Sequence, residues 1–187
     1  AVAIGRDLSA SGRGLLLGNP HYPWHGASRF HMIHLTIPGE LDVMGASLLT
    51  TNRVALGFNN DIAWTHTVST AKRFTLYRLV LNPQNPYEYL YDGDYRPIEK
   101  RSVTVSVRGD DGQLTTEQHQ TYFTHYGPVV ESAALGWKDG AAFAIRDAVI
   151  DNYLTAETYD ALAKATSTAE IEAAISQQGV YWTNTIA

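Results

Sequence analysis

Histidine is the residue type in this sequence best suited to chemistry, and two of the seven histidines lie in unusual segments. His21 is bracketed by prolines within 19–24 and is followed by Tyr22. Prolines restrict the backbone, so this loop presents its side chains in a fixed direction. His66 follows Trp64 in a segment with the alternation of a strand. On composition alone, a proline-stiffened corner packed with aromatic residues is the favoured explanation of the first segment. An aromatic core strand explains the second segment just as simply as a functional role does.

A metal centre is the second possibility that the histidines raise. His31 and His34 are three residues apart, and in a strand such residues point to opposite faces, so one ion could not readily bind both. No segment has the His-Glu-x-x-His spacing, and no carboxylate stands at ligand spacing. We expect no metal site, and a metal hydrolase using His21, His31 or His34 remains an alternative.

Serine is the other candidate nucleophile, because the chain contains no cysteine. None of its candidates lies in a Gly-x-Ser-x-Gly elbow, and sequence spacing alone does not reveal a serine–histidine–aspartate triad. These candidates are Ser9, Ser11, Ser28, Ser47 and Ser69. The segment 12–14, Gly-Arg-Gly, is too short to hold a phosphate, which leaves nucleotide binding with little support.

Composition narrows the class of protein further. The 187 residues are 44% hydrophobic, which suits one ordinary folded domain or one segment of a larger protein. The net charge is −5 and only 18% of residues are charged, so a nucleic-acid partner is not expected. No apolar run approaches the ~20 residues of a membrane-spanning helix, so no membrane span is expected.

Short strands are expected up to about residue 130, and these strands would position the side chains named above. Apolar or alternating runs, closed by proline, glycine or a turn, recur about every ten residues, as in an antiparallel sheet. The runs are 15–17, 29–37, 41–48, 54–58, 62–68 and 74–81. Both faces of 74–81 are apolar, so we expect it to be covered on both sides. The runs 103–107 and 114–123, joined by a turn, predict a protruding hairpin.

Helical sequence comes only near the end of the chain, at about 154–178. Good helix formers fill 155–165, and Ser167 is a helix N-cap followed by acidic residues. The second helix should run to about Gln178, and 180–186 should form a strand. Because this strand has no continuation and the chain starts at Ala1 rather than methionine, we expect a polypeptide that continues in both directions. The prediction is an incomplete α+β fold of mainly antiparallel strands with a C-terminal helical pair.

Three segments together resemble a known family. They are Ala1-Val-Ala-Ile-Gly5, Leu17-Gly-Asn-Pro-His-Tyr-Pro-Trp24 and Trp64-Thr-His-Thr-Val68. They are similar to the start of the large (β) subunit of the penicillin acylase family of N-terminal nucleophile (Ntn) serine hydrolases, with acyl-homoserine-lactone acylase and aculeacin A acylase as the nearest members. The likeness continues through 34–39, 42–46, 126–128 and 182–185. It implies that 1–187 is the N-terminal portion of that subunit and part of an αββα sandwich.

The resemblance also implies a mechanism and its residues. A precursor, or zymogen, would be cut to expose a serine whose own α-amino group serves as the base. That serine would begin a Ser-Asn pair directly before Ala1, outside this sequence. His21 matches the histidine that orients the new amino terminus. Val68 matches the residue whose backbone N–H forms half of the oxyanion hole, and an asparagine beyond Ala187 would complete it.

The acyl pocket of the family is matched by a further set of positions. They are Tyr22, Leu48, Val68, Trp182 and Thr183. Tyr22 stands where phenylalanine is usual, which would put a hydroxyl near the acyl chain, and Thr183 stands where a more apolar residue is common. The carboxylates that bind calcium in penicillin G acylases have no counterpart around 71–73, so no calcium and no cofactor are expected.

The intact protein is therefore expected to hydrolyse the amide bond of N-acyl compounds such as an acyl-homoserine lactone, a lipopeptide or a penicillin-type side chain. Such activity belongs to quorum quenching or antibiotic metabolism, in the bacterial periplasm or after secretion. The expected partners are the small (α) subunit and the remainder of the large subunit, and the chain alone should be inactive. The alternative is a non-enzymatic β-rich binding or structural module that uses Tyr22 and Trp24 as a ligand platform.

Overall fold

The computed structural model describes residues 1–132 and 134–187, and the chain divides into two units. The first unit contains residues 1–71 and 151–187, and the second contains residues 72–150. Each unit has its own sheet and its own hydrophobic core.

The sheet of the first unit has five antiparallel strands in the order β14–β6–β5–β4–β3. These strands are β3 (Phe30–Ile37), β4 (Leu41–Leu48), β5 (Leu56–Phe58), β6 (Ala63–Val68) and β14 (Thr183–Ile186). A separate pair is formed by β1 (Val2–Ile4) and β2 (Leu15–Leu17), which flank the short 3₁₀ helix Arg6–Leu8. Gly45 and Gly57 face each other across β4 and β5, and a Cβ at Gly45 would collide with the carbonyl oxygen of Leu56. The close approach of these two strands therefore requires glycine.

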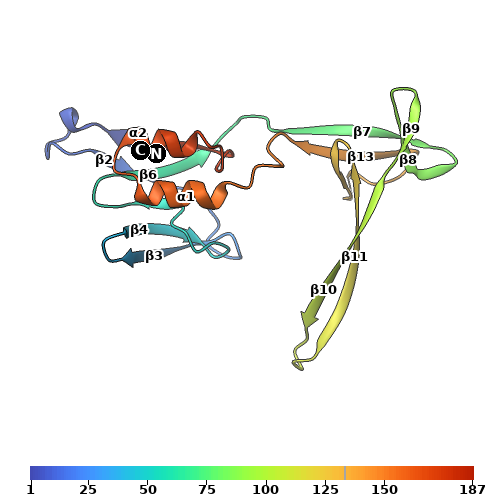
Figure 1. Cartoon of the computed structure of the whole chain (residues 1–187), viewed down its shortest axis with the longest axis horizontal. Coiled ribbons are helices and arrows are strands. Elements are labelled where there is room, and N and C mark those ends of the chain that lie inside the picture. Colours follow the sequence, from blue (N-terminus) through green and yellow to red (C-terminus); the bar gives the residue numbers. More distant parts are fainter. Residues whose placement is uncertain (133) are drawn as a thin grey trace. The chain divides into compact units, whose positions relative to one another are not determined.

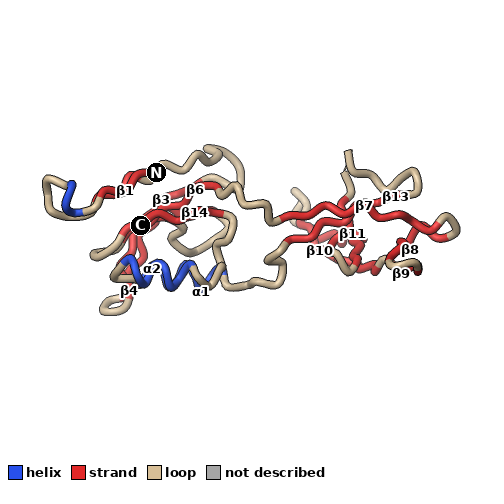
Figure 2. The backbone as a smooth tube through the Cα atoms, turned by 90° about the horizontal axis from the view of Figure 1, so that it is seen from above, coloured by secondary structure: helices blue, strands red, loops and turns tan. Residues whose placement is uncertain are grey.

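Two helices pack against this sheet, α1 (Thr155–Lys164) and α2 (Thr168–Ile175), as Figures 1 and 2 show. Ser167 caps α2 as predicted, because its hydroxyl accepts the N–H of Glu170 at 3.3 Å. The helix ends at Ile175, before the predicted Gln178, whose φ of 57° is left-handed and incompatible with a continuing helix.

Trp64 forms the centre of the first core and is 1% exposed. Its indole N–H donates to the carbonyl of Ala55 at 3.1 Å, so the polar atom of this ring is satisfied in the core. Leu162 of α1 and Ile171 of α2 belong to the same cluster. The amphipathic helices thus bury apolar residues in the same core as Trp64.

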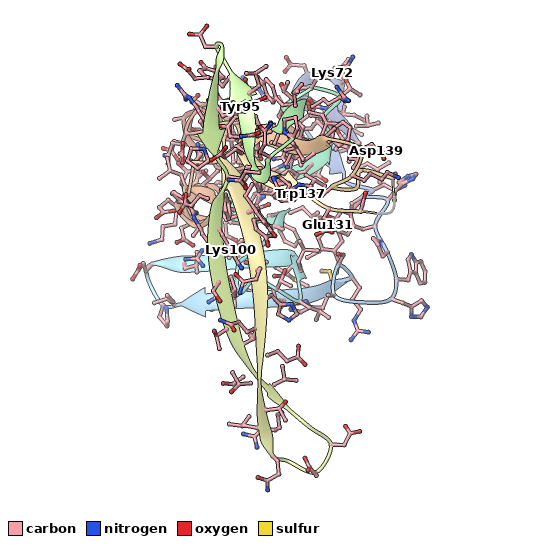
Figure 3. All side chains as sticks on the ribbon, turned by 90° about the vertical axis from the view of Figure 1, so that its right-hand side faces the viewer. Lys72, Tyr95, Lys100, Glu131, Trp137 and Asp139 are labelled. Carbon is pink, nitrogen blue, oxygen red and sulfur yellow. The ribbon has the colours of Figure 1, made fainter. Side chains whose placement is uncertain are left out.

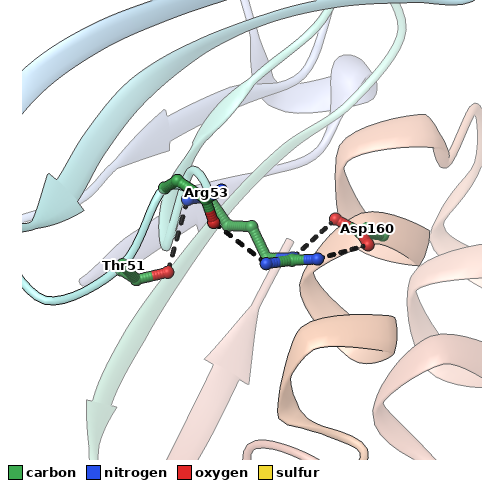
Figure 4. A network of polar contacts seen from close by, with 4 residues as sticks. Thr51, Arg53 and Asp160 are labelled. Atoms are coloured by element: carbon green, nitrogen blue, oxygen red, sulfur yellow. Dashed lines mark hydrogen bonds and ion pairs between the residues drawn. The ribbon is translucent and has the colours of Figure 1, made fainter.

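An ion pair fastens α1 to the loop after β4 (Figure 4). The guanidinium of Arg53 donates to both carboxylate oxygens of Asp160, at 2.8 and 3.0 Å. The N–H of Arg53 also donates to the hydroxyl of Thr51 at 3.3 Å. Hydrogen bonding to Asp160 raises the pKa of Arg53. This contact fixes α1 directly beside Tyr159, the residue before Asp160.

The second unit is a seven-stranded antiparallel sheet in the order β10–β11–β12–β13–β7–β8–β9. Its strands are β7 (Phe74–Asn82), β8 (Asn85–Tyr91), β9 (Asp94–Pro97), β10 (Glu99–Arg108), β11 (Leu114–Thr124), β12 (Gly127–Val130) and β13 (Ala141–Asp147). The predicted protruding hairpin is present as β10 and β11, which extend beyond the rest of this sheet from near Lys100 (Figure 3). Strand β13 extends the strand-rich region beyond residue 130.

One prediction about this sheet is wrong. Strand β7 was expected to be covered on both faces, but only the face of Leu79 and Leu81 is buried. Leu76 and Val80 on the opposite face are about half exposed. Apolar residues on both faces of a strand are therefore not enough to predict that other described residues of the chain cover both faces.

The fold class is confirmed as α+β, with mainly antiparallel strands and two helices. Within 1–132 and 134–187, no helix combines the length and the apolar character that crossing a membrane requires.

Candidate functional site

A cavity of about 350 Å³ in the first unit is lined by every residue that the family resemblance assigned to the site. Those residues are His21, Tyr22, Leu48, Val68, Trp182 and Thr183. The rest of the lining comes from Ala1, Asn19, Pro20, Phe30, Ala55, Leu56, His66, Thr67 and Tyr159. The structure thus brings together residues from both ends of the chain, while the individual roles assigned to them remain predictions.

The ends of several strands build the cavity. Phe30 and Leu48 face each other where β3 and β4 pair. The loop that bears His21 and Tyr22 connects β2 to β3, and the rings of Tyr22 and Phe30 pack with centroids 4.8 Å apart. Because the prolines on either side of His21 and Tyr22 restrict the loop, its aromatic side chain has a defined place against β3.

Val68 is the last residue of β6 and pairs with Thr183, the first residue of β14. Beyond this pair, the N–H of Ser69 donates to the carbonyl of Trp182 at 3.1 Å. Hydrogen-bonded and non-hydrogen-bonded pairs alternate in an antiparallel ladder, so the Val68–Thr183 pair is of the second kind. The N–H of Val68 therefore points away from β14, and the ladder between β6 and β14 leaves this donor unused beside the cavity.

His66 joins the two strands that form this wall. Its Nδ1 lies 3.1 Å from the hydroxyl oxygen of Thr185 and 3.4 Å from that of Thr183, both on β14. Burial lowers the pKa of His66 to about 4, and the carbonyl of Ala55 opposes the shift. The imidazole is therefore neutral near pH 7. The segment around His66 is unusual in the sequence, but neither its pattern nor the family resemblance predicted a role for this histidine in the site.

Tyr159 lines the cavity from α1, and sequence analysis did not identify it. Its ring stands edge-on to His66 with centroids 6.1 Å apart. Burial and, to a smaller extent, the neighbouring Tyr22 raise the pKa of Tyr159 to about 12, so this phenol also stays neutral. No local motif marks the residue, because it reaches the cavity only after α1 has packed on the sheet.

The cavity has the chemistry of a binding pocket rather than of a complete catalytic centre. Among the described residues that line it there is no serine, cysteine or carboxylate. Its walls are mainly apolar and aromatic, with a few polar groups and the free N–H of Val68, which is the usual composition of a small-molecule pocket. A substrate bound here would meet no serine or cysteine nucleophile among these described lining residues.

The alternative sites have less structural support. His34 is engaged with Asp42, its Nε2 lying 2.6 Å from the carboxylate. Within 1–132 and 134–187, no group of three or more histidine, aspartate or glutamate side chains is arranged to hold a metal ion. Trp24 lies outside the cavity and is 89% exposed, although it shares a shallow hollow with Tyr22.

Comparisons with known proteins point to one family. The sequence model for penicillin amidase matches residues 1–187. The chain is 46% identical over 189 aligned positions to the acyl-homoserine lactone acylase PvdQ of Pseudomonas putida, which covers 100% of this chain and 24% of the relative. It is 37% identical to the aculeacin-A acylase of Actinoplanes utahensis, covering 100% of this chain and 23% of that protein.

A solved structure supports the same fold. The thermostable penicillin G acylase of Alcaligenes faecalis superposes with a TM-score of 0.69 over 84% of this chain and 27% of that one, at 24% sequence identity. The chain thus spans about a quarter of the length of the curated relatives and of this solved chain.

Proposed function

Since this chain belongs to the penicillin amidase family, as its resemblance predicted, we propose that it is the pocket-bearing segment of an Ntn amidohydrolase that cleaves the amide bond of N-acyl compounds. The observation that carries the proposal is the cavity itself. Residues matched to the family from four separate segments of the sequence, around 21–22, 48, 68 and 182–183, line one largely apolar space. The two relatives compared above are themselves an acyl-homoserine lactone acylase and an aculeacin-A acylase.

The proposed nucleophile is a serine two residues before Ala1. Ala1 lines the cavity, and two residues of extended chain span about 7 Å, so a serine at that distance would reach the pocket. Its α-amino group would take the proton from its own hydroxyl as that hydroxyl attacks the amide carbonyl. His21, on the rigid loop, would orient this amino terminus.

The negative charge that develops on the carbonyl oxygen requires hydrogen-bond donors fixed in advance. The N–H of Val68 fits this role because β14 does not use it. A side-chain amide from an asparagine beyond Ala187 would be the second donor. Collapse of this intermediate would break the C–N bond and expel the amine, which takes the proton held by the α-amino group. Water would then hydrolyse the acyl-enzyme, which releases the acid and restores the serine.

The acyl group would lie among Tyr22, Leu48, Trp182 and Thr183. Aromatic and aliphatic walls favour an apolar acyl chain, because its burial removes about 25 cal/mol per Å² of apolar surface from water. An acyl-homoserine lactone, a lipopeptide or a penicillin-type side chain would each present such a group next to an amide bond.

The proposed active site would be completed by parts of the protein outside residues 1–187. A precursor would be cut to expose the serine, and the small subunit together with the rest of the large subunit would complete the site. Export to the periplasm or secretion would bring the enzyme to its substrates. Residues 1–187 alone would be inactive, because neither the serine nor the distant asparagine lies among them.

The test uses the complete protein, expressed from its full coding sequence. Intact mass and N-terminal sequencing should reveal a chain that begins Ser-Asn-Ala-Val-Ala, together with a second, smaller chain. A fluorogenic fatty-acyl amide should be hydrolysed by this material and not by residues 1–187 alone. An uncut protein, or a cut protein that releases no acid from any N-acyl amide, would contradict the proposal.

A further inference from the structure

The first unit contains a second cavity, of about 180 Å³, between its sheet and α1. The buried part of this cavity is apolar, because Val43 and Val54 line it and are 1% and 2% exposed. Together with Leu35 and Leu41 they give it four aliphatic side chains, and we call it the aliphatic cavity. The polar residues that line it are Asn52, Arg53, Asp160 and Lys164.

Tyr159 stands between the aliphatic cavity and the 350 Å³ cavity of the proposed acyl pocket. Of the residues that the structure describes, Tyr159 alone lines both. The consecutive residues Val54 and Ala55 line one cavity each, so the two spaces adjoin at this point of the chain. Tyr159, Val54 and Ala55 also belong to one hydrophobic cluster. The tyrosine is therefore a shared wall of two neighbouring cavities.

The position of this wall is defined by its surroundings. Tyr159 is 8% exposed, and its ring stands edge-on to His66 with centroids 6.1 Å apart. The next residue, Asp160, accepts two hydrogen bonds from the guanidinium of Arg53 at 2.8 and 3.0 Å (Figure 4). This pair anchors the turn of α1 that carries the tyrosine. Because protein interiors are close-packed, a ring held in this way resists displacement by a ligand.

We propose that Tyr159 sets the longest straight acyl chain that the pocket accepts, by closing the pocket toward the aliphatic cavity. The inference rests on the proposed acylase function and specifies its substrates by length. A chain that ends before the ring can bury all its methylenes. A longer chain meets the ring and must leave its last carbons outside the pocket or displace packed groups. A smaller side chain at this position would join two spaces that both suit an alkyl chain.

The size of the effect follows from the hydrophobic gain per carbon. Burying one methylene strengthens binding about fourfold. The value of kcat/KM should therefore rise by about this factor with each added carbon until the chain reaches Tyr159, and then level off. Without the ring the rise should continue into the aliphatic cavity. Two further methylenes would raise the ratio of kcat/KM for a long and a short substrate by at least about tenfold.

The test is a series of p-nitroanilides of unbranched acids, from butyric to palmitic acid, cleaved by the complete protein. Tyr159→Leu and Tyr159→Ala remove the ring to different extents, and Tyr159→Phe keeps the ring and removes only its hydroxyl. Each variant is described by the ratio of kcat/KM for long and short substrates, which is independent of the fraction of folded enzyme. Tyr159→Leu retains an apolar side chain of intermediate size, so it serves if the alanine variant does not fold.

Two further variants separate the role of the wall from general damage to the core. Leu162→Ala is the matched control, because Leu162 is a fully buried residue of the same helix and cluster but lines neither cavity. Ala163 lines the aliphatic cavity and not the acyl pocket. Ala163→Leu, added to Tyr159→Leu, should refill the aliphatic cavity and return the chain-length profile toward that of the unmodified protein.

We expect the chain length at which kcat/KM stops rising to increase by about two carbons in Tyr159→Leu and by more in Tyr159→Ala. It should stay unchanged in Tyr159→Phe and Leu162→Ala. The inference is overturned if the unmodified protein shows no such limit, if the limit stays in place in an active Tyr159→Leu, or if Leu162→Ala moves it equally. Each of these results leaves the acylase function standing, whereas a complete protein that cleaves no member of the series overturns both.

Discussion

The unused N–H of Val68 gives the sharpest test of the proposed mechanism. Val68→Pro removes this donor and leaves the rest of the pairing between β6 and β14 intact, because the hydrogen bond beyond the pair comes from Ser69. Proline is tolerated where a strand residue has no ladder bond, and it favours an extended conformation at the preceding Thr67, which already lies in β6. Val68 is 79% exposed, so the exchange disturbs little packing.

The expected loss of kcat in Val68→Pro follows from the role of the N–H as a hydrogen-bond donor to the oxyanion. Loss of one oxyanion donor lowers kcat by about 10²–10³-fold, or roughly 3–4 kcal/mol of transition-state stabilisation. The change should appear in kcat more than in KM, because the charge on the oxygen develops only in the transition state. The assay is steady-state hydrolysis of a fluorogenic acyl amide by the complete protein, with a thermal melt of each variant.

Val68→Ala is the matched comparison, since it shortens the same side chain and keeps the N–H. If the N–H of Val68 is an oxyanion donor, kcat of the proline variant lies at least tenfold below kcat of the alanine variant, with both folded. Equal kcat values for the two folded variants would refute the assignment of the backbone N–H, whatever their KM values.

Three further predictions concern stability, measured on the same protein by urea or thermal unfolding. His66 has a pKa of about 4 in the folded state against 6.5 ordinarily, so between these pH values the unfolded state binds one proton more than the folded state. The free energy of unfolding should therefore fall by about 3 kcal/mol as the pH drops from 6.5 to 4. His66→Gln should remove this pH dependence, whereas His119→Gln, at an exposed histidine, should leave it unchanged. Trp64→Ala should cost about 3–5 kcal/mol because the ring is fully buried and its N–H is bonded, while Trp24→Ala, with an exposed ring, should change stability by less than about 0.5 kcal/mol. Asp160→Asn should cost at most about 1 kcal/mol, less in high salt, since the carboxylate is half exposed; a larger, salt-independent loss would contradict this view of the ion pair.

The predicted fold agrees with the structure where the sequence carries a strong local signal. Strands β3 and β4 have alternating or apolar residues that end at a turn, and Ser167 has the chemistry of an N-cap, so each could be located within a few residues. Strand β13 was missed because Ala141, Ala142 and Ala144 favour helix over strand. It is a strand because β7 and β12 pair with it on either side, and this stabilisation depends on contacts far apart in the sequence.

The site also contains residues that the sequence could identify and residues whose position depends on contacts far apart in the sequence. Residues that a family resemblance could place, such as His21 and Val68, line the cavity, and their catalytic roles remain to be tested. Tyr159 could not have been found in this way from the residues alone, because its neighbours in the sequence form an ordinary amphipathic helix. Its position depends on the packing of α1, which the Arg53–Asp160 ion pair supports.

His66 and Tyr159, the two buried titratable groups of the pocket wall, are neutral near pH 7, and this has a consequence for catalysis. His66 remains unprotonated above its pKa of about 4, and Tyr159 remains protonated below its pKa of about 12, so neither buried group changes charge across the range in which most proteins are folded. Neutral groups at these two positions preserve the low polarity in which one N–H donor is worth most to a developing oxyanion. They also leave the buried part of the pocket without a group suited to proton transfer near pH 7. In the proposed enzyme the base would therefore be a group other than these two, and a serine placed before Ala1, which lines the cavity, would bring its own amine.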